Sequence, residues 1–238
     1  MKNKRIMITG ANGGLGKAFI KAILELSPDI VYCTARDIKS MDSIKDISER
    51  VEVIEMDITS KNSIYNAVSK IDTLDILINN AGSNSNTRLF DSSFSDLEVN
   101  LKGTINLTEA LFKKLKVSKG KVVNITSIMA LINFPSIANY CISKSALHSF
   151  TQALRSEFKL FDGEVYEVLP GPIDTRMSEE LDTEKTKAKD VVDIVLNAIK
   201  NKEFEIYPDK ASKSIKKRLE QEPIKIVEEF LLSLPQDS

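Results

Sequence analysis

The sequence Arg5-Ile-Met-Ile-Thr9-Gly10-Ala-Asn-Gly-Gly14-Leu-Gly16 decides the fold. The segment from Arg5 to Thr9 is a short apolar run typical of a buried strand, and a glycine-rich turn follows it at once. The residues from Lys17 to Leu26 then predict a helix. A strand, a glycine-rich turn and a helix begin a dinucleotide-binding unit, because the glycines let backbone N–H groups approach a pyrophosphate at the positive end of the helix. The alternative is a glycine-rich turn that binds no ligand.

The rest of the chain alternates strands with helices. Further strands are predicted at 30–34, 51–56, 74–79, 121–127, 164–169 and 204–207. Helices are predicted at 40–48, 60–69, 97–115, 138–161, 189–200 and 211–232, and Pro223 can break the last of them. This alternation predicts an α/β fold with a doubly wound parallel sheet of about seven strands in three α/β/α layers. No linker or repeat interrupts it, so we expect one domain over residues 1–238.

Composition excludes several classes of protein. The chain has 238 residues, of which 42% are hydrophobic and 28% are charged, with a net charge of -1. A net charge this close to zero provides no positive electrostatic potential that would attract nucleic acid or an anionic membrane surface. No apolar run approaches the length of a transmembrane helix, and the apolar segment near the N-terminus is too short for a signal peptide. Cys33 and Cys141 suggest neither a disulfide framework nor a metal site, so we expect a cytoplasmic protein without a metal.

Polar or glycine-bearing turns follow the predicted strands. In open parallel sheets the ligand binds beyond the carboxyl ends of the strands, where such turns meet. The turns in question carry Gly10, Arg36, Asp57, Asn80, Ser127 and Pro170. Their convergence at one edge predicts a binding site there.

The stretch Tyr140-Cys-Ile-Ser-Lys144 carries the chemistry at this edge. Four residues apart on a helix, the tyrosine and the lysine share a face, and a nearby ammonium favours the phenolate form. Ser127 ends the preceding strand, so its hydroxyl can lie beside the tyrosine. A phenol that exchanges a proton and a serine that holds an oxygen suit the reduction of a carbonyl or the oxidation of an alcohol. A solvated helix face is the alternative for the pair taken alone.

Together these motifs resemble the short-chain dehydrogenase/reductases, in their short single-domain branch with the Rossmann fold. The resemblance covers residues 5 to about 175, and each motif is modest alone but specific in this order and spacing. The matches are Thr9 to Gly16 for TGxxxGxG, Asp57, Asn79-Asn-Ala-Gly82 for NNAG, Asn100, Ser127, Tyr140/Lys144 for YxxxK, and Pro170 to Thr175 for PGxxxT. The glycines also fit the TGxxGxxG pattern of the extended branch, but the chain has no room for the substrate domain of that branch.

The resemblance implies a role for each matching residue. Tyr140 would be the general acid in reduction, Ser127 would bond the substrate oxygen, Lys144 would bond the nicotinamide ribose, and Asn100 would hold a water linked to Lys144. The cofactor-binding residues would be Gly10, Asn12, Gly13, Gly14, Leu15, Gly16, Arg36, Asp57, Ile58, Asn80, Ala81, Gly82, Tyr140, Lys144, Pro170, Gly171, Ile173 and Thr175. The segment at about 176–189 would be a short substrate lid, followed by a C-terminal helical segment at about 211–232.

The end of the second strand predicts a preference for NADP(H) over NAD(H). An NAD-preferring enzyme of this fold usually ends that strand with an acidic residue that binds the ribose 2′-OH. Here Ala35 occupies this position, and Arg36 beside it offers a guanidinium suited to phosphate. Asp37 would take the ribose role instead if the strand ended later than expected.

Three alternatives about function and assembly stay open. The same catalytic residues serve 3-oxoacyl-[acyl-carrier-protein] reductases, and a basic patch beside the cleft would favour that substrate because carrier proteins are acidic. A non-catalytic dinucleotide sensor would be expected to lose the tyrosine or the lysine, which are present here. The helices predicted at 97–115 and 138–161 carry apolar residues on more than one side, so a homodimer or homotetramer is expected.

The substrate itself is a small molecule with a carbonyl or an alcohol group, and its identity is not specified by these motifs. Apolar residues follow Ser127, namely Leu131, Ile132, Phe134, Pro135 and Ile137. They either line a substrate pocket or pack against neighbouring elements. The single histidine, His148, is expected to be structural, as are the exposed acidic residues Glu179 and Glu180.

Overall fold

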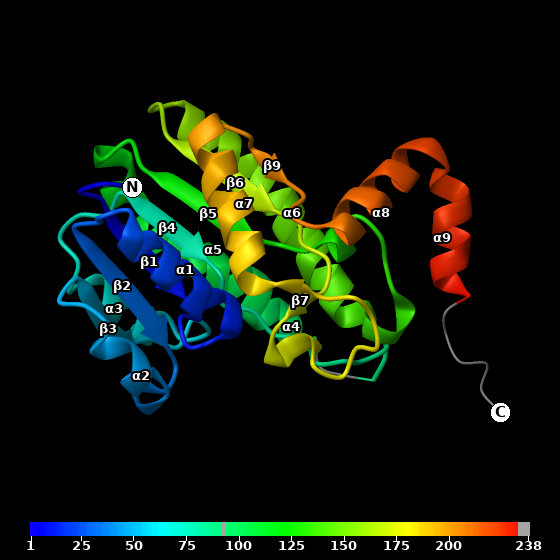
Figure 1. Ribbon diagram of the computed structural model, residues 1–238, viewed down its shortest axis with the longest axis horizontal. Helices are drawn as coiled ribbons and strands as arrows, with labels where there is room; N and C mark the ends of the chain where they lie inside the picture. Colours follow the sequence, from blue (N-terminus) through cyan, green and yellow to red (C-terminus); the bar gives the residue numbers. More distant parts are fainter. Residues whose placement is uncertain (92–93, 233–238) are drawn as a thin grey trace.

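A parallel sheet forms the centre of the protein. The computed structural model describes residues 1–91 and 94–232; the last six positions of the predicted domain lie outside the described residues. Within the described part, seven strands pair in parallel in the order β3-β2-β1-β4-β5-β6-β9 (Figure 1). Their bounds are β1 Arg5–Thr9, β2 Ile30–Ala35, β3 Val51–Glu55, β4 Ile76–Asn79, β5 Lys121–Ile125, β6 Glu164–Val168 and β9 Glu205–Ile206. The predicted doubly wound sheet is therefore confirmed.

Helices cover both faces of this sheet. Their bounds are α1 Gly14–Glu25, α2 Asp42–Lys45, α3 Lys61–Val68, α4 Ser95–Leu97, α5 Thr104–Val117, α6 Ala138–Lys159, α7 Ala188–Asn201, α8 Lys210–Gln221 and α9 Pro223–Leu231. The chain direction changes at Glu222, immediately before Pro223, as the sequence predicted. None of the helices in 1–91 or 94–232 is long and apolar enough to cross a membrane.

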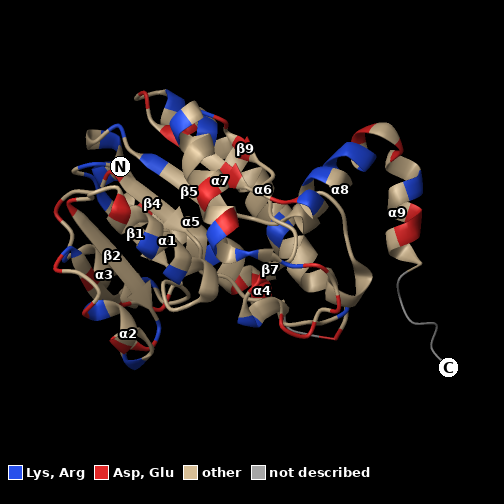
Figure 2. Ribbon diagram, in the orientation of Figure 1, with Lys and Arg blue, Asp and Glu red and all other residues tan. Residues whose placement is uncertain are grey.

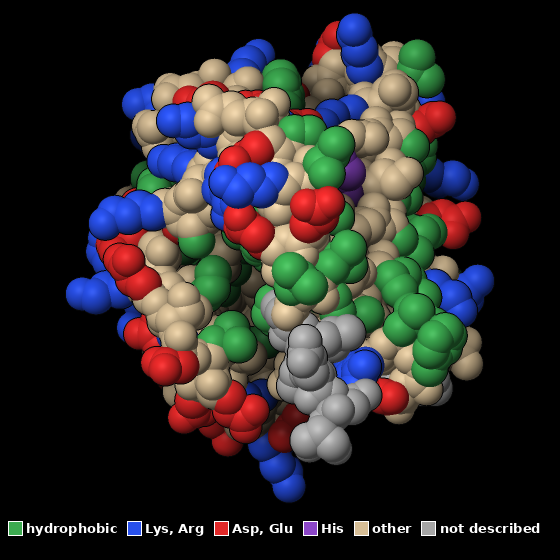
Figure 3. All heavy atoms as spheres, turned by 90° about the vertical axis from the view of Figure 1, so that its right-hand side faces the viewer, with side chains coloured by type: hydrophobic (Ala, Val, Ile, Leu, Met, Phe, Trp, Pro, Cys, Tyr) green, Lys and Arg blue, Asp and Glu red, His purple; other side chains and the backbone are tan. Residues whose placement is uncertain are grey.

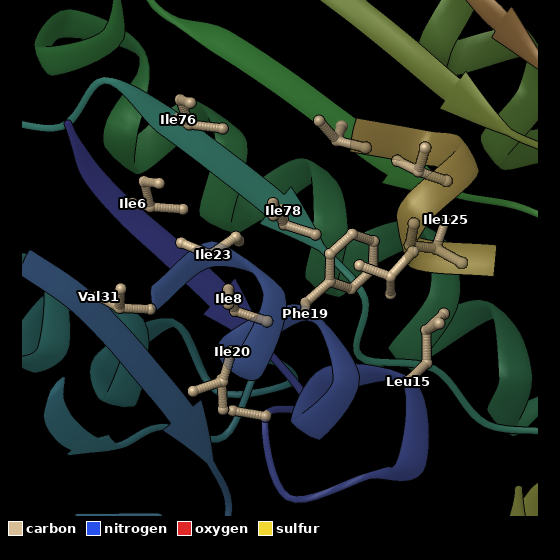
Figure 4. Close-up of a cluster of buried hydrophobic side chains, with 14 of the residues drawn as sticks. Ile6, Ile8, Leu15, Phe19, Ile20, Ile23, Val31, Ile76, Ile78 and Ile125 are labelled. Carbon is tan, nitrogen blue, oxygen red and sulfur yellow. The ribbon is translucent and has the colours of Figure 1, made fainter. Parts of the chain in front are cut away.

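The two hydrophobic cores follow from the alternation of side chains along each strand. Ile6 and Ile8 of β1 point to one face and pack under α1 and α7, whereas Met7 points to the other face, under α3 and α5. Figure 4 shows the first core, in which Phe19 and Ile23 of α1 lie over the strands. Charged residues lie mainly on helices and loops, and the central strands β2 and β4 carry none (Figure 2). This packing leaves the carboxyl edge of the sheet free to present its turns.

Some local structure departs from the simple helix and strand pattern. The predicted helix at 97–115 begins with a π-helical stretch at Glu98–Gly103 before α5. Two short strands, β7 Ile173–Asp174 and β8 Thr186–Lys187, pair in parallel; β7 precedes the segment predicted as a lid at 176–189, and β8 lies within it. The segment predicted as a helix at 40–48 is a 3-10 helix at Ile38–Met41 followed by α2.

The C-terminal helix α9 stands on the side of the molecule that Figure 3 presents. Phe230 of α9 meets Phe134 edge-to-face, with ring centroids 5.8 Å apart, and Ile226 is fully buried. Phe134 therefore packs against this helix, and Ile132 is buried as well. Other apolar side chains of α9 remain exposed, Ile224 among them.

Candidate active site

The glycine-rich turn has the backbone geometry that a dinucleotide requires. Gly10 has a φ of 61°, in the left-handed region. A Cβ on Gly16 would lie 2.4 Å from the carbonyl oxygen of Gly10, so only glycine allows the turn to approach the helix this closely. α1 begins at Gly14 without a side-chain cap and without an acidic residue in its first turn. Its free N–H groups and positive dipole end suit a pyrophosphate.

A second turn is tied directly to the first. The Asn80 side chain donates hydrogen bonds to the carbonyl oxygens of Thr9 and Gly10, at 2.8 and 3.1 Å. The backbone N–H groups of Asn80 and Ala81 both donate to the Thr9 hydroxyl. Asn80 and Ala81, predicted as cofactor contacts, thus also join the carboxyl ends of β1 and β4.

β2 ends at Ala35, one residue later than predicted. Exposed Arg36 leaves the strand. The Asp37 carboxylate caps the following 3-10 helix by accepting a hydrogen bond from the Lys39 N–H at 2.9 Å. Asn12 of the glycine turn reaches the same segment, because its amide donates to the Ser40 hydroxyl at 3.0 Å.

Asp57 and Ile58 follow β3 at the same edge. The Asp57 carboxylate accepts hydrogen bonds from the Thr59 N–H and hydroxyl, and these bonds, with a smaller contribution from the charge of Arg36, lower its pKa. Ile58 is buried, and a Cβ on Gly103 would lie 2.8 Å from its side chain. Ile58 therefore packs against the π-helical stretch.

Tyr140, Lys144 and Ser127 come together at the carboxyl end of β5. The Lys144 ammonium is buried, lies 5.7 Å from the centre of the Tyr140 ring, and donates to the Ile125 carbonyl at 2.9 Å. The Ser127 side chain is near enough to the Tyr140 hydroxyl to lower its pKa. The Ser127 hydroxyl donates to the Pro170 carbonyl at 3.5 Å, and the Met129 N–H donates to the Ser127 oxygen at 3.1 Å. The strand, the loop and helix α6 thus place all three side chains in one group.

Burial moves both titrating groups away from their ordinary pKa values. Tyr140 is half-buried, and the loss of surrounding water raises its pKa to about 12, although Ser127 lowers it in part. Burial also lowers the pKa of Lys144 to about 8, and the negative charge of Asp96 opposes this change. Each shift disfavours the charged form, as expected for groups removed from water.

Asn100 lies within the π-helical stretch and is completely buried. Its side-chain oxygen accepts from the Ser83 N–H at 2.8 Å, and its amide donates to the Ser83 carbonyl and to the Ser143 hydroxyl. A Cβ on Gly82 would lie 3.2 Å from the Asn100 oxygen and 3.6 Å from the Lys144 nitrogen. Gly82 therefore lies close to both Asn100 and Lys144, and a side chain there would crowd the Asn100 oxygen.

The turn after β6 closes the site against the first turn. The Pro170 carbonyl accepts a hydrogen bond from the Ile128 N–H at 2.9 Å, and the Gly171 N–H donates to the Asp209 carboxylate at 2.8 Å. Ile173 begins β7. Thr175, just after β7, packs against Gly14: a Cβ on Gly14 would lie 2.8 Å from the threonine methyl.

The comparisons with known proteins agree with this geometry. The family model described as short chain dehydrogenase matches residues 4–186. The chain belongs to this family. It is 32% identical over 191 residues to a protein of Rickettsia typhi named 3-oxoacyl-[acyl-carrier-protein] reductase FabG, covering 78% of this chain and 79% of that protein. This short-chain dehydrogenase is therefore an NAD(P)-dependent oxidoreductase.

Two solved structures show which cofactors similar proteins bind. A short chain dehydrogenase from Burkholderia cenocepacia, in complex with NADP, has a TM-score of 0.92 and 30% identity, with 98% of this chain and 99% of that chain covered. A protein from Burkholderia phymatum, in complex with NAD, has a TM-score of 0.81 and 22% identity, with 100% and 98% covered. The second likeness concerns the fold alone.

The structure of this short-chain dehydrogenase also shows site residues that the motifs do not contain. Asp96 is completely buried beside Asn100, and Asp209 holds the turn at Gly171. His148, in contrast, binds a buried carboxylate away from the catalytic group, with its Nδ1 2.9 Å from an oxygen of Glu167. Within 1–91 and 94–232, no group of three or more acidic, histidine or cysteine side chains could hold a metal.

Proposed function

We propose that this enzyme interconverts a carbonyl and an alcohol by hydride transfer, with NADP(H) as the preferred cofactor. The observation that carries the proposal is the placement of Tyr140, Lys144 and Ser127 in one group beside the glycine-rich turn. A bound nicotinamide would supply or accept the hydride. Tyr140 would give its proton to the substrate oxygen in reduction, and the Ser127 hydroxyl would bond the same oxygen.

The energetics explain why the cofactor charge matters to Tyr140. Moving its pKa from about 12 to near 7 requires roughly 7 kcal/mol of preferential stabilisation of the phenolate. One ammonium at about 6 Å supplies roughly 3 kcal/mol at an effective dielectric constant near 20. Lys144 therefore provides less than half, and the positive charge of an oxidised nicotinamide is the natural source of more. Asn100 would keep Lys144 in place and hold the water that links it to solvent.

The preference for NADP(H) rests on the end of β2. No carboxylate stands at the Ala35 position to repel a 2′-phosphate, and exposed Arg36 offers a planar set of donors. Asp37 lies two residues beyond the end of β2, and one oxygen of its carboxylate accepts the Lys39 N–H as a helix cap. The likeness to a structure in complex with NADP supports the same choice.

A carrier-bound 3-oxoacyl group is the second candidate substrate, because similar proteins are named reductases of such groups. The segment from Arg176 to Lys189 is mixed in charge, with four basic and four acidic residues, so its charge favours neither a carrier-bound nor a free substrate. We keep the free small carbonyl compound as the first candidate and the carrier-bound group as the second. Comparing reduction of an acetoacetyl group on coenzyme A and on a carrier protein separates the two.

Replacing Tyr140 by Phe tests the chemistry. A screen of aldehydes, ketones and alcohols with both cofactors first identifies a substrate. Tyr140→Phe then removes only a hydroxyl, so it should abolish turnover while cofactor binding and the fold persist. Tyr65→Phe is the matched control, because Tyr65 is 75% exposed on α3. A Tyr140→Phe variant that keeps more than roughly a hundredth of the rate contradicts a general-acid role, whose loss costs about 100-fold or more.

Assembly and location complete the proposal. Leu101 and Ile105, on the helical segment 98–117, are apolar and only half-buried. Such side chains suit a twofold partner, so we propose a homodimer or homotetramer in the cytoplasm. Light scattering at micromolar concentration tests it, and a monomer mass would contradict it.

A further inference from the structure

Asp96 is a buried acid that the proposed chemistry does not use. It lies in α4, one helical turn before Asn100, and none of its surface is exposed. A carboxylate removed from water is costly unless donors compensate it. Here the compensation comes from Ser83 and Ser85, whose positions are therefore linked to that of Asp96.

Three donors surround the Asp96 carboxylate. The Ser83 hydroxyl donates to one oxygen at 2.7 Å, and the Ser85 hydroxyl and N–H donate to the other at 2.8 and 3.0 Å. Asn100 binds the backbone N–H and carbonyl of the same Ser83. Asp96 and Asn100, one helical turn apart, thus hold the segment 83–85 together: Asp96 binds its serine hydroxyls, and Asn100 binds the backbone of Ser83.

This segment leads directly to Lys144. Gly82 precedes Ser83 and lies close to both the Asn100 oxygen and the Lys144 nitrogen. Among the described residues, the titratable groups whose charge affects Tyr140 or Lys144 are Asp96 from α4 and Cys141 from α6. β5 contributes the uncharged Ile125 carbonyl. Asp96 raises the pKa of both Lys144 and Tyr140, as a negative charge does for any neighbouring group.

We propose that Asp96 is a positioning residue of this active site: it fixes Ser83 and Ser85 against Asn100, and its negative charge balances the buried ammonium of Lys144. The inference rests on the proposed function. It adds a role for a residue outside the motifs, and it fixes the direction in which the pKa values of Tyr140 and Lys144 must change. Removal of the charge must lower the pKa of both Tyr140 and Lys144, so the titration of the pair moves to lower pH.

The titration of Tyr140 itself provides the measurement, without a known substrate. With saturating NADP⁺, ultraviolet absorbance reports phenolate formation as the pH rises. The difference between each protein and the same protein carrying Tyr140→Phe isolates Tyr140 from the other tyrosines. The variants are Asp96→Asn, which removes the charge, and Ser85→Ala, which removes one donor and no charge. Asp75→Asn is the matched control, since Asp75 binds Lys4 and the Arg5 N–H at the opposite edge of the sheet.

We expect the midpoint of the Tyr140 titration to lie at lower pH in Asp96→Asn and to stay unchanged in the other variants. One unit charge acting over roughly 10 Å at an effective dielectric constant near 20 changes a pKa by about one unit. Ser85→Ala and Asp75→Asn should keep the midpoint of the unmodified enzyme. If Asp96→Asn does not fold, as judged by circular dichroism, Asp96→Ser provides a second neutral variant that keeps an acceptor oxygen, with the same expected shift.

Two outcomes overturn the inference. One is an Asp96→Asn or Asp96→Ser midpoint equal to that of the unmodified enzyme. The other is an equal shift in Ser85→Ala, which would mean that displacement of the loop, and not the charge, moves the titration. The proposed function fails separately: it is contradicted if Tyr140→Phe retains activity, whereas an inactive Tyr140→Phe with an unmoved Asp96→Asn midpoint contradicts only the role of Asp96.

Discussion

Replacing Lys144 by Met should make the folded protein more stable while abolishing its activity. Lys144 is only 5% exposed, and burial lowers its pKa from the ordinary 10.5 to about 8. At pH 7 the side chain is charged in both the folded and the unfolded protein, so the folded state carries the cost of the buried charge. Methionine keeps the unbranched apolar stem and removes that cost.

The size of the effect follows from the pKa difference. A shift from 10.5 to about 8 corresponds to roughly 3 kcal/mol at pH 7. The substitution also leaves the Ile125 carbonyl without the lysine donor, which costs about 1 kcal/mol. We therefore expect the free energy of unfolding to rise by about 2 kcal/mol at pH 7. Above the unfolded pKa both states are neutral, so this advantage disappears there and the lost hydrogen bond dominates.

Urea denaturation at pH 7 and near pH 10 measures the gain in the free energy of unfolding and its dependence on pH. Lys144→Met should be more stable than the unmodified protein at pH 7, and the gap should shrink as the pH rises from about 8 towards 10.5. Lys113→Met on the exposed surface of α5 is the control and should show no pH-dependent gap. A Lys144→Met variant that is less stable at pH 7, or a gap independent of pH, would refute the reasoning.

Three further predictions concern the cofactor and the core. Arg36→Ala should reduce the preference for NADPH over NADH by about tenfold or more, because it removes a charge-assisted bond. Fluorescence titration measures this preference, Arg50→Ala at the opposite end of the neighbouring strand should keep it, and an unchanged preference in Arg36→Ala would contradict the 2′-phosphate role. Gly16→Ala should abolish cofactor binding or folding, since a Cβ would lie 2.4 Å from a backbone oxygen; normal affinity would contradict the close turn. His148→Ala should lower the free energy of unfolding by about 1–3 kcal/mol, because the buried Glu167 loses its nearest partner and keeps the more distant Arg155 as a charged neighbour; lost activity with unchanged stability would indicate a catalytic histidine instead.

The fold could be predicted from the sequence because strands and turns carry strong local signals. The strand at Arg5–Thr9 has the predicted bounds, and the β2 prediction ended one residue early, which leaves Ala35 and Arg36 in the expected places. The π-helical stretch at 98–103 was not predictable, because its apolar spacing resembles that of an ordinary helix. The strands β7 and β8 have two residues each, too few to carry a sequence period, and they form by pairing with each other across the chain between them.

The site could be predicted only where a residue type has a recognisable spacing. The four-residue separation of Tyr140 and Lys144 and the glycine pattern provide such spacing, and the structure brings these residues together. Asp96 precedes Asn100 by the same separation, which would have placed the two on one helical face. In a polar stretch, however, an acidic residue usually faces solvent, and only the path of the segment 83–85 shows that this one does not.

The direction of proton transfer follows from the same burial that raises the pKa of Tyr140. Without a second positive charge, a phenol with a pKa of about 12 keeps its proton at neutral pH. It then has a proton to give, which is the state that carbonyl reduction needs. A bound oxidised nicotinamide would add positive charge at the site and favour the phenolate, which is the base that alcohol oxidation needs. Under the proposed function, the charge of the cofactor and that of Lys144 would together set the protonation state of Tyr140, so one side chain would serve both directions without a separate acid and base.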